Sequence, residues 1–351
     1  TQLSDLKLTG MKLGKLVTMD SSFASTGYTK KIDLTGLDVS ELTSMSGIFS
    51  GAAVSEVDIS GWQALKLGKL DGTFVGATNL VKVDMSDSVY PSVTTWDTVF
   101  SSQSNLSLTD IDFSNTDFSQ LTSMNAFFAN FPKLQIVNLE GTDFSNVTSM
   151  VNMFRNSTNL STVNMKNMKT GKLEDISQMF DSTSSLTAIN LKDLDLSTVT
   201  KMIGIINGSG VTSVNLDSTN LSSIEDMGKA FTGATNMKTF SMKNATLTKV
   251  SDVREMFLND TSLTDIDMSG TVMDKLSHTD YWFKDCSALK TIDISGATLS
   301  VDLVGSEEQS NGYLFENVPS GVSVKVKDEK AKEFIEDQFG FSNITGTAVI
   351  A

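Results

Sequence analysis

The chain has 351 residues, of which 39% are apolar, so it can bury a large core. Its formal net charge of −15 argues against nucleic acid and anionic membrane surfaces as partners, because both attract a basic face. No apolar run approaches the ~18 residues of a membrane span. The single cysteine excludes an internal disulfide, and the single histidine excludes a metal site built from several histidines.

A motif of one apolar, one polar and one apolar residue recurs along the chain in steps of 25 to 28 residues, most often 26. Its period of two and its β-branched residues predict a short strand at each copy. The copies begin at Leu6, Ile32, Val57, Val83, Ile111, Val137, Val163, Ile189, Val214, Phe240, Ile266 and Ile292. We therefore expect one continuous array of about twelve coils in place of two globular domains.

Three more apolar residues follow in each unit at positions i, i+3 and i+7, as in Leu42, Met45 and Phe49. This spacing predicts a short helix or 3-10 turn. The last position predicts a buried ladder, formed by Phe23, Phe49, Phe74, Phe100, Phe128, Phe154, Phe180, Ile206, Phe231, Phe257 and Phe283. Ile206 interrupts the ladder in a unit that is one residue short, so we expect a local thinning or bend there. Extra residues at Ser101 to Leu106 predict a loop bulge.

A three-residue strand and a two-turn helix cannot bury a core alone, but stacked units can. The predicted fold is an α/β solenoid, a leucine-rich-repeat-like stack of about twelve 26-residue coils. A parallel β-sheet forms its concave face, and short helices or 3-10 turns lie opposite.

Residues 1–299 form this solenoid, and residues 300–351 form a C-terminal capping unit. In the cap we expect a polar loop at Ser306 to Gly312 and a strand at Val324 to Val326. A helix should run from Asp328 to Gln338, with Asp328 as N-cap and Gly340 as the stop.

Two consecutive stretches, residues 147–154 and 159–165, carry the most specific signature: Val-Thr-Ser-Met-Val-Asn-Met-Phe, then Asn-Leu-Ser-Thr-Val-Asn-Met. The signature resembles the repeat of BspA-like leucine-rich repeat surface proteins, and the resemblance covers roughly residues 1–300. It implies a bacterial surface-anchored adhesin that binds ligands of a host or a neighbouring cell. The chain begins almost inside a repeat, so we expect an extracellular, cell-surface fragment without its signal and anchor.

The polar residues at and after the centre of each motif should form rows on the concave face. Asp flanked by Ser dominates both ends, whereas Asn flanked by Lys dominates the centre. The predicted ligand-binding residues are Asn138, Glu140, Asn164, Lys166, Asn190, Lys192, Asn215, Asp217 and Lys243. Three interpretations stay open: solubilising Asn and Asp ladders, a central groove for glycans or an extended peptide, and metal bridging between stacked Asp residues.

The row of Asp33, Asp58, Asp84 and Asp112 should stack at about 5 Å, where like charges repel by about 1 kcal/mol per pair in water. This repulsion predicts a raised pKa for at least some of them. With net charge also shrinking toward the pI, we expect stronger adhesion at about pH 4–5 than at pH 7.

Catalytic patterns are missing from the sequence. His278 and Cys286 are eight residues apart, but nothing else supports a Cys–His nucleophile pair. We predict a buried structural Cys286 and a solvated His278. There is no phosphate loop, zinc spacing or Ser-His-Asp set, so no enzyme activity, metal or cofactor is predicted.

The predicted function is that of a non-catalytic, monomeric binding domain of a bacterial surface adhesin. It would contact a host glycoprotein such as mucin, or an extracellular-matrix protein, through the concave sheet. Neither nucleic acid binding nor membrane insertion is expected. The alternative is a structural spacer that holds another domain away from the cell wall.

Overall fold

The computed structural model describes residues 3–11, 15–96, 98–100, 107–299, 313–342 and 344–351. The chain divides into two compact units, Thr1–Leu173 and Glu174–Ala351. Each unit is a parallel β-solenoid with coils about 26 residues apart, as predicted. The predicted loops at residues 101–106 and 306–312 lie outside the described residues.

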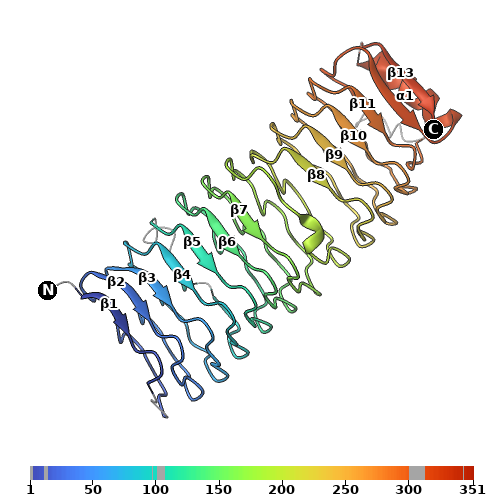
Figure 1. The fold of residues 1–351 in the computed structure, drawn as a ribbon. Coiled ribbons are helices and arrows are strands. Elements are labelled where there is room, and N and C mark those ends of the chain that lie inside the picture. The colour runs from blue at the N-terminus through green and yellow to red at the C-terminus, as the bar shows by residue number, and fades with distance from the viewer. Residues whose placement is uncertain (1–2, 12–14, 97, 101–106, 300–312, 343) are drawn as a thin grey trace. The chain divides into compact units, whose positions relative to one another are not determined.

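The first unit carries a seven-stranded parallel sheet in which the strands follow one another in chain order (Figure 1). Its strands are β1 (Leu3–Lys7), β2 (Thr29–Asp33), β3 (Val54–Asp58), β4 (Lys82–Asp84), β5 (Asp110–Asp112), β6 (Ile136–Asn138) and β7 (Thr162–Asn164). Equivalent motif residues pair with one another, for example Ile111 with Val137 and Val137 with Val163.

The second unit begins with a short 3-10 helix, η1 (Leu191–Asp193), and carries a six-stranded parallel sheet. Its strands are β8 (Ser213–Asn215), β9 (Thr239–Ser241), β10 (Asp265–Asp267), β11 (Thr291–Asp293), β12 (Val322–Val326) and β13 (Gly346–Ile350). Helix α1 (Glu329–Phe341) joins β12 to β13 and contacts both (Figure 1). No helix in the described ranges is long and apolar enough to cross a membrane.

The predicted phenylalanine ladder forms the core of both units. Phe49, Phe74 and Phe128 are completely buried, and only Phe23, in the first coil, is half-buried. Neighbouring rings stack almost parallel, with centroids 5.4 Å apart for Phe49 and Phe74. In the second unit the ladder continues through Phe283 to Phe315, a rung that the sequence analysis missed.

The segments at i, i+3 and i+7 form turns, and none of those in the described residues is a regular helix. Their backbone groups bond to the next coil, as when Gly47 N–H donates to Asp71 O at 2.8 Å and Phe49 N–H to Thr73 O at 2.9 Å. The residue two positions before the ladder is left-handed, for example Gly47 at φ 61°. A residue in the left-handed region cannot continue a right-handed helix, so the segment forms a turn at this point.

The eighth motif, Ile189 to Leu191, does not form the predicted strand. Asn190 caps η1: its Oδ1 accepts from Lys192 N–H at 3.2 Å, and its Nδ2 donates to Asp193 Oδ1 at 3.0 Å. Asn138 and Asn164 make the same Oδ1 bond within strands, so the feature that distinguishes Asn190 is its Nδ2 bond to Asp193 within the same turn.

The C-terminal helix begins where the sequence predicts it. Asp328 is the N-cap of α1, and its Oδ1 accepts from Ala331 N–H at 3.0 Å. The helix runs one residue past Gly340, so the predicted stop is wrong. β13 was not predicted. It pairs with β12 over five residues and thereby extends the sheet beyond the last motif.

Candidate functional site

Carboxylates form a row on the outer face of the sheet in the first unit. Asp33, Asp58, Asp84 and Asp112 pair in register across β2 to β5. The Oδ1 atom of each accepts a backbone N–H and a hydroxyl from the residue two positions later, with hydroxyl distances of 2.7, 2.8, 2.7 and 2.6 Å. This is the Asx-turn arrangement that Asp favours at the end of an extended segment.

The predicted rise in pKa along this row is wrong for Asp33 and Asp58. Burial raises both pKa values, but hydrogen bonds outweigh burial. Bonds from Thr35 hold the pKa of Asp33 below its ordinary value. The pKa of Asp58 is lowered by hydrogen bonds from Lys31, whose Nζ lies 2.9 Å from Asp58 Oδ2, and from Ser60. Repulsion between Asp33 and Asp58 therefore does not support the expectation of stronger adhesion at pH 4–5, which stays a prediction from net charge alone.

The Asn row continues this hydrogen-bonded pattern within the first unit. Asn138 Nδ2 donates to both carboxylate oxygens of Asp112, at 3.1 and 3.2 Å. Asn164 Nδ2 donates to Asn138 Oδ1 at 3.0 Å and to Glu140 Oε2 at 3.1 Å. Lys166 Nζ lies 3.9 Å from Glu140 Oε1. The structure thus brings four predicted site residues together and holds their side chains in place.

A groove of about 310 Å³ lies on this face, over β4 to β7. Its lining includes Asn138 and Asn164, but also Lys82, Asp110, Ile136 and Thr162, which the sequence analysis missed. Each of these four is the residue just before a motif. The sequence signal that could have identified them is Ile136, an isoleucine at a position that is polar in most of the repeats. The groove combines an exposed aliphatic side chain with ordered polar groups, which is the composition of many ligand sites.

The predicted site residues of the second unit do not form one row. Asn190 and Lys192 belong to η1 and its cap, not to a strand. Asn215 Oδ1 accepts from Asp217 N–H at 2.9 Å, and Asp217 Oδ1 accepts from Ser241 Oγ at 2.5 Å. Lys243 Nζ pairs with Asp267 Oδ2 at 2.9 Å. Asp217, Lys192 and neighbouring residues line a smaller hollow of about 230 Å³.

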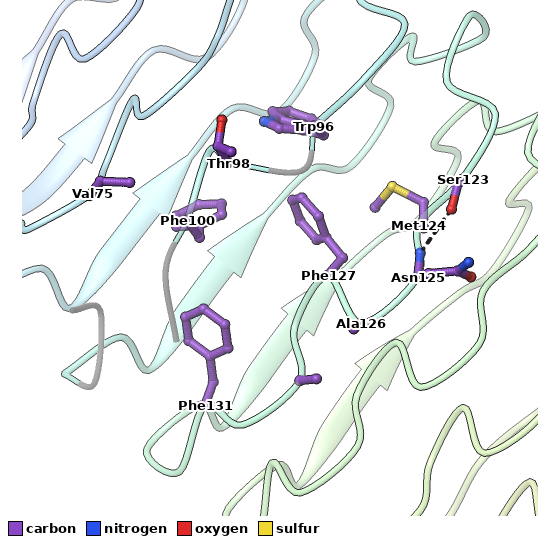
Figure 2. Close-up of a pocket in the computed structure, with 11 residues that line it drawn as sticks. Val75, Trp96, Thr98, Phe100, Ser123, Met124, Asn125, Ala126, Phe127 and Phe131 are labelled. Atoms are coloured by element: carbon purple, nitrogen blue, oxygen red, sulfur yellow. Dashed lines mark hydrogen bonds between the residues drawn. The ribbon is translucent and has the colours of Figure 1, made fainter. Parts of the chain in front are cut away.

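A second cavity in the first unit, of about 480 Å³, opens on the turn segments. Figure 2 shows Phe100, Phe127 and Phe131 along it, with Ser123 and Asn125 at the far side. Here the ladder loses its stacking: Phe100 and Phe128 are 6.5 Å apart and tilted by 45°. Phe127 packs edge-on against Phe128 at 4.5 Å. The lining combines core rings with the exposed residues Asn125 and Ala126, so the cavity is open to the surface of this coil.

Cys286 and His278 do not meet as a catalytic pair. Cys286 is buried, as predicted, and its Sγ donates to Phe257 O at 3.1 Å. Burial raises the pKa of this thiol well above its ordinary value, which suppresses the nucleophilic thiolate. His278 is exposed, as predicted, and its Nδ1 lies 2.9 Å from Ser277 Oγ. Within the described ranges, no cluster of three or more His, Cys, Asp or Glu residues could hold a metal ion.

Family comparison matches the chain to the family described as "Mycoplasma protein of unknown function, DUF285", over residues 4–113, 94–218 and 187–296. The chain belongs to this family. The overlapping matches follow the repeat, so the DUF285 family signature is carried by the solenoid coils. No curated protein matches the chain.

Two solved structures are similar to this DUF285 chain at low identity. A leucine-rich repeat protein of Leptospira interrogans is 11% identical, with 96% of this chain and 95% of that one covered and a TM-score of 0.24. The TLR13 chain of a complex with ssRNA13 is 12% identical, with a TM-score of 0.25. The match covers 93% of this chain but spans only 57% of the TLR13 chain.

Proposed function

We propose that this protein is a non-catalytic binding module of a BspA-like bacterial surface adhesin, located outside the cell. The groove over β4 to β7 would contact an extended part of a host glycoprotein such as mucin, or of a matrix protein. The protein acts as a monomer and uses no cofactor.

One observation carries the proposal: Ile136 is 44% exposed in a groove whose polar neighbours are already fixed in place. Covering an exposed aliphatic side chain with a binding partner is favourable, because it removes apolar surface from water. The ordered Asn138 and Asn164 side chains lose little conformational entropy on binding, because hydrogen bonds already restrain them.

The alternative, a spacer, is favoured by a different observation. Hydrogen bonds link the side chains of Asp112, Asn138 and Asn164 from strand to strand, as expected of a solubilising ladder. The spacer predicts that changes in the groove leave all binding unaffected.

The test is surface-plasmon binding of the purified chain to mucin and to matrix proteins. Ile136→Asp places a charge in the groove and should lower binding at least tenfold. Leu65→Asp is the matched control, since Leu65 is 52% exposed but does not line the groove. Equal loss in both variants would overturn the groove as the site. If the unaltered chain binds neither mucin nor matrix proteins, the adhesin proposal fails and the spacer stands.

A further inference from the structure

Four strands place one residue each in a straight row along the groove. Lys82, Asp110, Ile136 and Thr162 pair in register from β4 to β7. All four line the groove of about 310 Å³. Adjacent strands are about 4.8 Å apart, so the row presents a cation, a carboxylate, an aliphatic group and a hydroxyl at regular intervals.

Ile136 interrupts the polar character of this row. Its neighbour in sequence, Val137, is completely buried and supplies the core contact of β6, whereas 44% of Ile136 is exposed. Polar residues flank it in register on both sides, Asp110 on β5 and Thr162 on β7. The row therefore offers a small apolar contact between two hydrogen-bonding groups.

The two flanking groups have hydrogen-bonding capacity left. Asp110 Oδ2 accepts from the Thr109 hydroxyl. Among the described residues, Asp110 Oδ1 and the Thr162 hydroxyl have no hydrogen-bond partner. By contrast, the Asn138 carbonyl already accepts from Glu140 N–H and Asn164 Nδ2. The available donor and acceptor therefore lie in the row that contains Asp110 and Thr162, not in the row of Asn side chains.

We propose that Asp110, Ile136 and Thr162 recognise the acetamido group of an N-acetylated sugar. The acetyl methyl group would rest on Ile136, the amide N–H would donate to Asp110, and the carbonyl would accept from Thr162. In a trans amide the N–H and C=O point in opposite directions, which matches a carboxylate and a hydroxyl on opposite sides of one aliphatic residue. Lys82, which pairs in register with Asp110, would lie nearest the ring hydroxyls.

This inference rests on the proposed function, since it names the glycan class that the same groove takes from a glycoprotein. The proposed contacts would also distinguish two sugars that differ in a single substituent. Glucose lacks the methyl, the N–H and the carbonyl of N-acetylglucosamine. A groove that only binds sugar hydroxyls would not distinguish the two.

The experiment titrates the ¹³C-methyl-labelled chain with N-acetylglucosamine, glucose and an N-acetylated amino-acid amide, followed by NMR. We expect the Ile136 methyl signal to shift with N-acetylglucosamine at about tenfold lower concentration than with glucose, as the loss of one or two contacts implies. Thr162→Val should remove this preference. Ile136→Ser should also remove it; this variant lacks the Ile136 methyl group and is therefore followed through the methyl signals of Ile111 and Val137, which line the same groove. Thr162→Ser keeps the hydroxyl and should restore the preference, and Leu65→Ser should leave it unchanged.

Equal binding of N-acetylglucosamine and glucose would overturn the acetamido assignment. Binding of the acetylated amino-acid amide as tightly as the sugar, with the same Ile136 shift, would assign the groove to peptides and overturn the sugar class. The proposed function is judged separately, by the loss of mucin binding in Ile136→Asp. If mucin binding depends on Ile136 but the groove shows no preference for N-acetylated sugars, the adhesin proposal is supported and the acetamido inference is refuted.

Discussion

Asp260 Oδ1 accepts a hydrogen bond from the backbone N–H of Ala234, one coil earlier, at 2.7 Å. Its second carboxyl oxygen is buried without a hydrogen-bond partner in the described residues. Burial raises the pKa of Asp260 well above its ordinary value, and the bonds from Ala234 and Gly233 only partly oppose this. In the first unit, Ser157 holds the equivalent position, accepting from Phe131 N–H and donating to Phe128 O.

The stability of the protein should therefore fall as the pH rises above the ordinary pKa of an Asp. Because the folded pKa of Asp260 is raised, the folded chain binds more protons than the unfolded chain, and the stabilising contribution is lost as pH passes through the folded pKa. Asp260→Ser should flatten this slope and raise the free energy of unfolding at pH 7 by about 1 kcal/mol. Urea unfolding between pH 4 and 8 measures both effects.

The control for this prediction is Asp267→Asn in the same unit. Burial raises the pKa of Asp267, but hydrogen bonds from Ser269 and Lys243 leave it below its ordinary value. Its contribution is therefore present above the ordinary pKa and lost as pH falls, so this substitution should weaken acid sensitivity. A steep slope above pH 5 that survives Asp260→Ser would show that another group causes it.

Truncation of the ladder should be strongly destabilising. Phe154 is completely buried and stacks on Phe128 with ring centroids 5.6 Å apart. Phe154→Ala should lower the free energy of unfolding by about 3–5 kcal/mol, through lost burial and a cavity. Phe23→Ala, at the half-buried end of the same ladder, is the comparison and should lower it less. A loss below about 1 kcal/mol for Phe154→Ala would contradict its core role.

Filling the cavity shown in Figure 2 should stabilise the first unit. Ala129 lines this space of about 480 Å³ and is 6% exposed. Ala129→Val adds two methyl groups beside Phe131 and should raise the free energy of unfolding by about 0.5–1 kcal/mol. Thermal and urea unfolding measure the gain. A loss of similar size would mean that the space is too tight for the added atoms.

Asn190 should matter for stability and not for binding. Its side chain caps η1 through Lys192 N–H, so Asn190→Ala should lower the free energy of unfolding by about 1 kcal/mol. Because it does not stand in a strand, mucin binding should stay within about twofold of the unaltered chain. Asn164→Ala, which removes the donor to Asn138, should weaken binding instead. The reverse order of effects in plasmon binding would place the site in the second unit.

The sequence alone determined the repeat and most of its strands. Hydrophobic spacing is a property of single residues counted along the chain, and stacked coils convert it directly into a ladder. This explains why Phe49, Phe128 and Phe257 lie where the 26-residue step puts them. The N-cap of α1 was also predictable from the sequence, because Asp328 accepts its hydrogen bond from Ala331, only three residues later in the chain.

Only the tertiary structure decided what the polar rows do. Charge repulsion between stacked Asp residues was predictable, but the bonds from Thr35 and Lys31 that outweigh it depend on the backbone turn and on register. Asn190 and Asn164 each accept from the backbone N–H two residues later. Yet Asn190 Nδ2 donates to Asp193 in its own turn, whereas Asn164 Nδ2 donates to Asn138 on the neighbouring strand. Ile136 became a candidate contact only once the pairing of β5, β6 and β7 set it between Asp110 and Thr162. Hydrophobic burial follows from sequence periodicity, whereas a polar group's role depends on which partners the fold brings within about 3 Å.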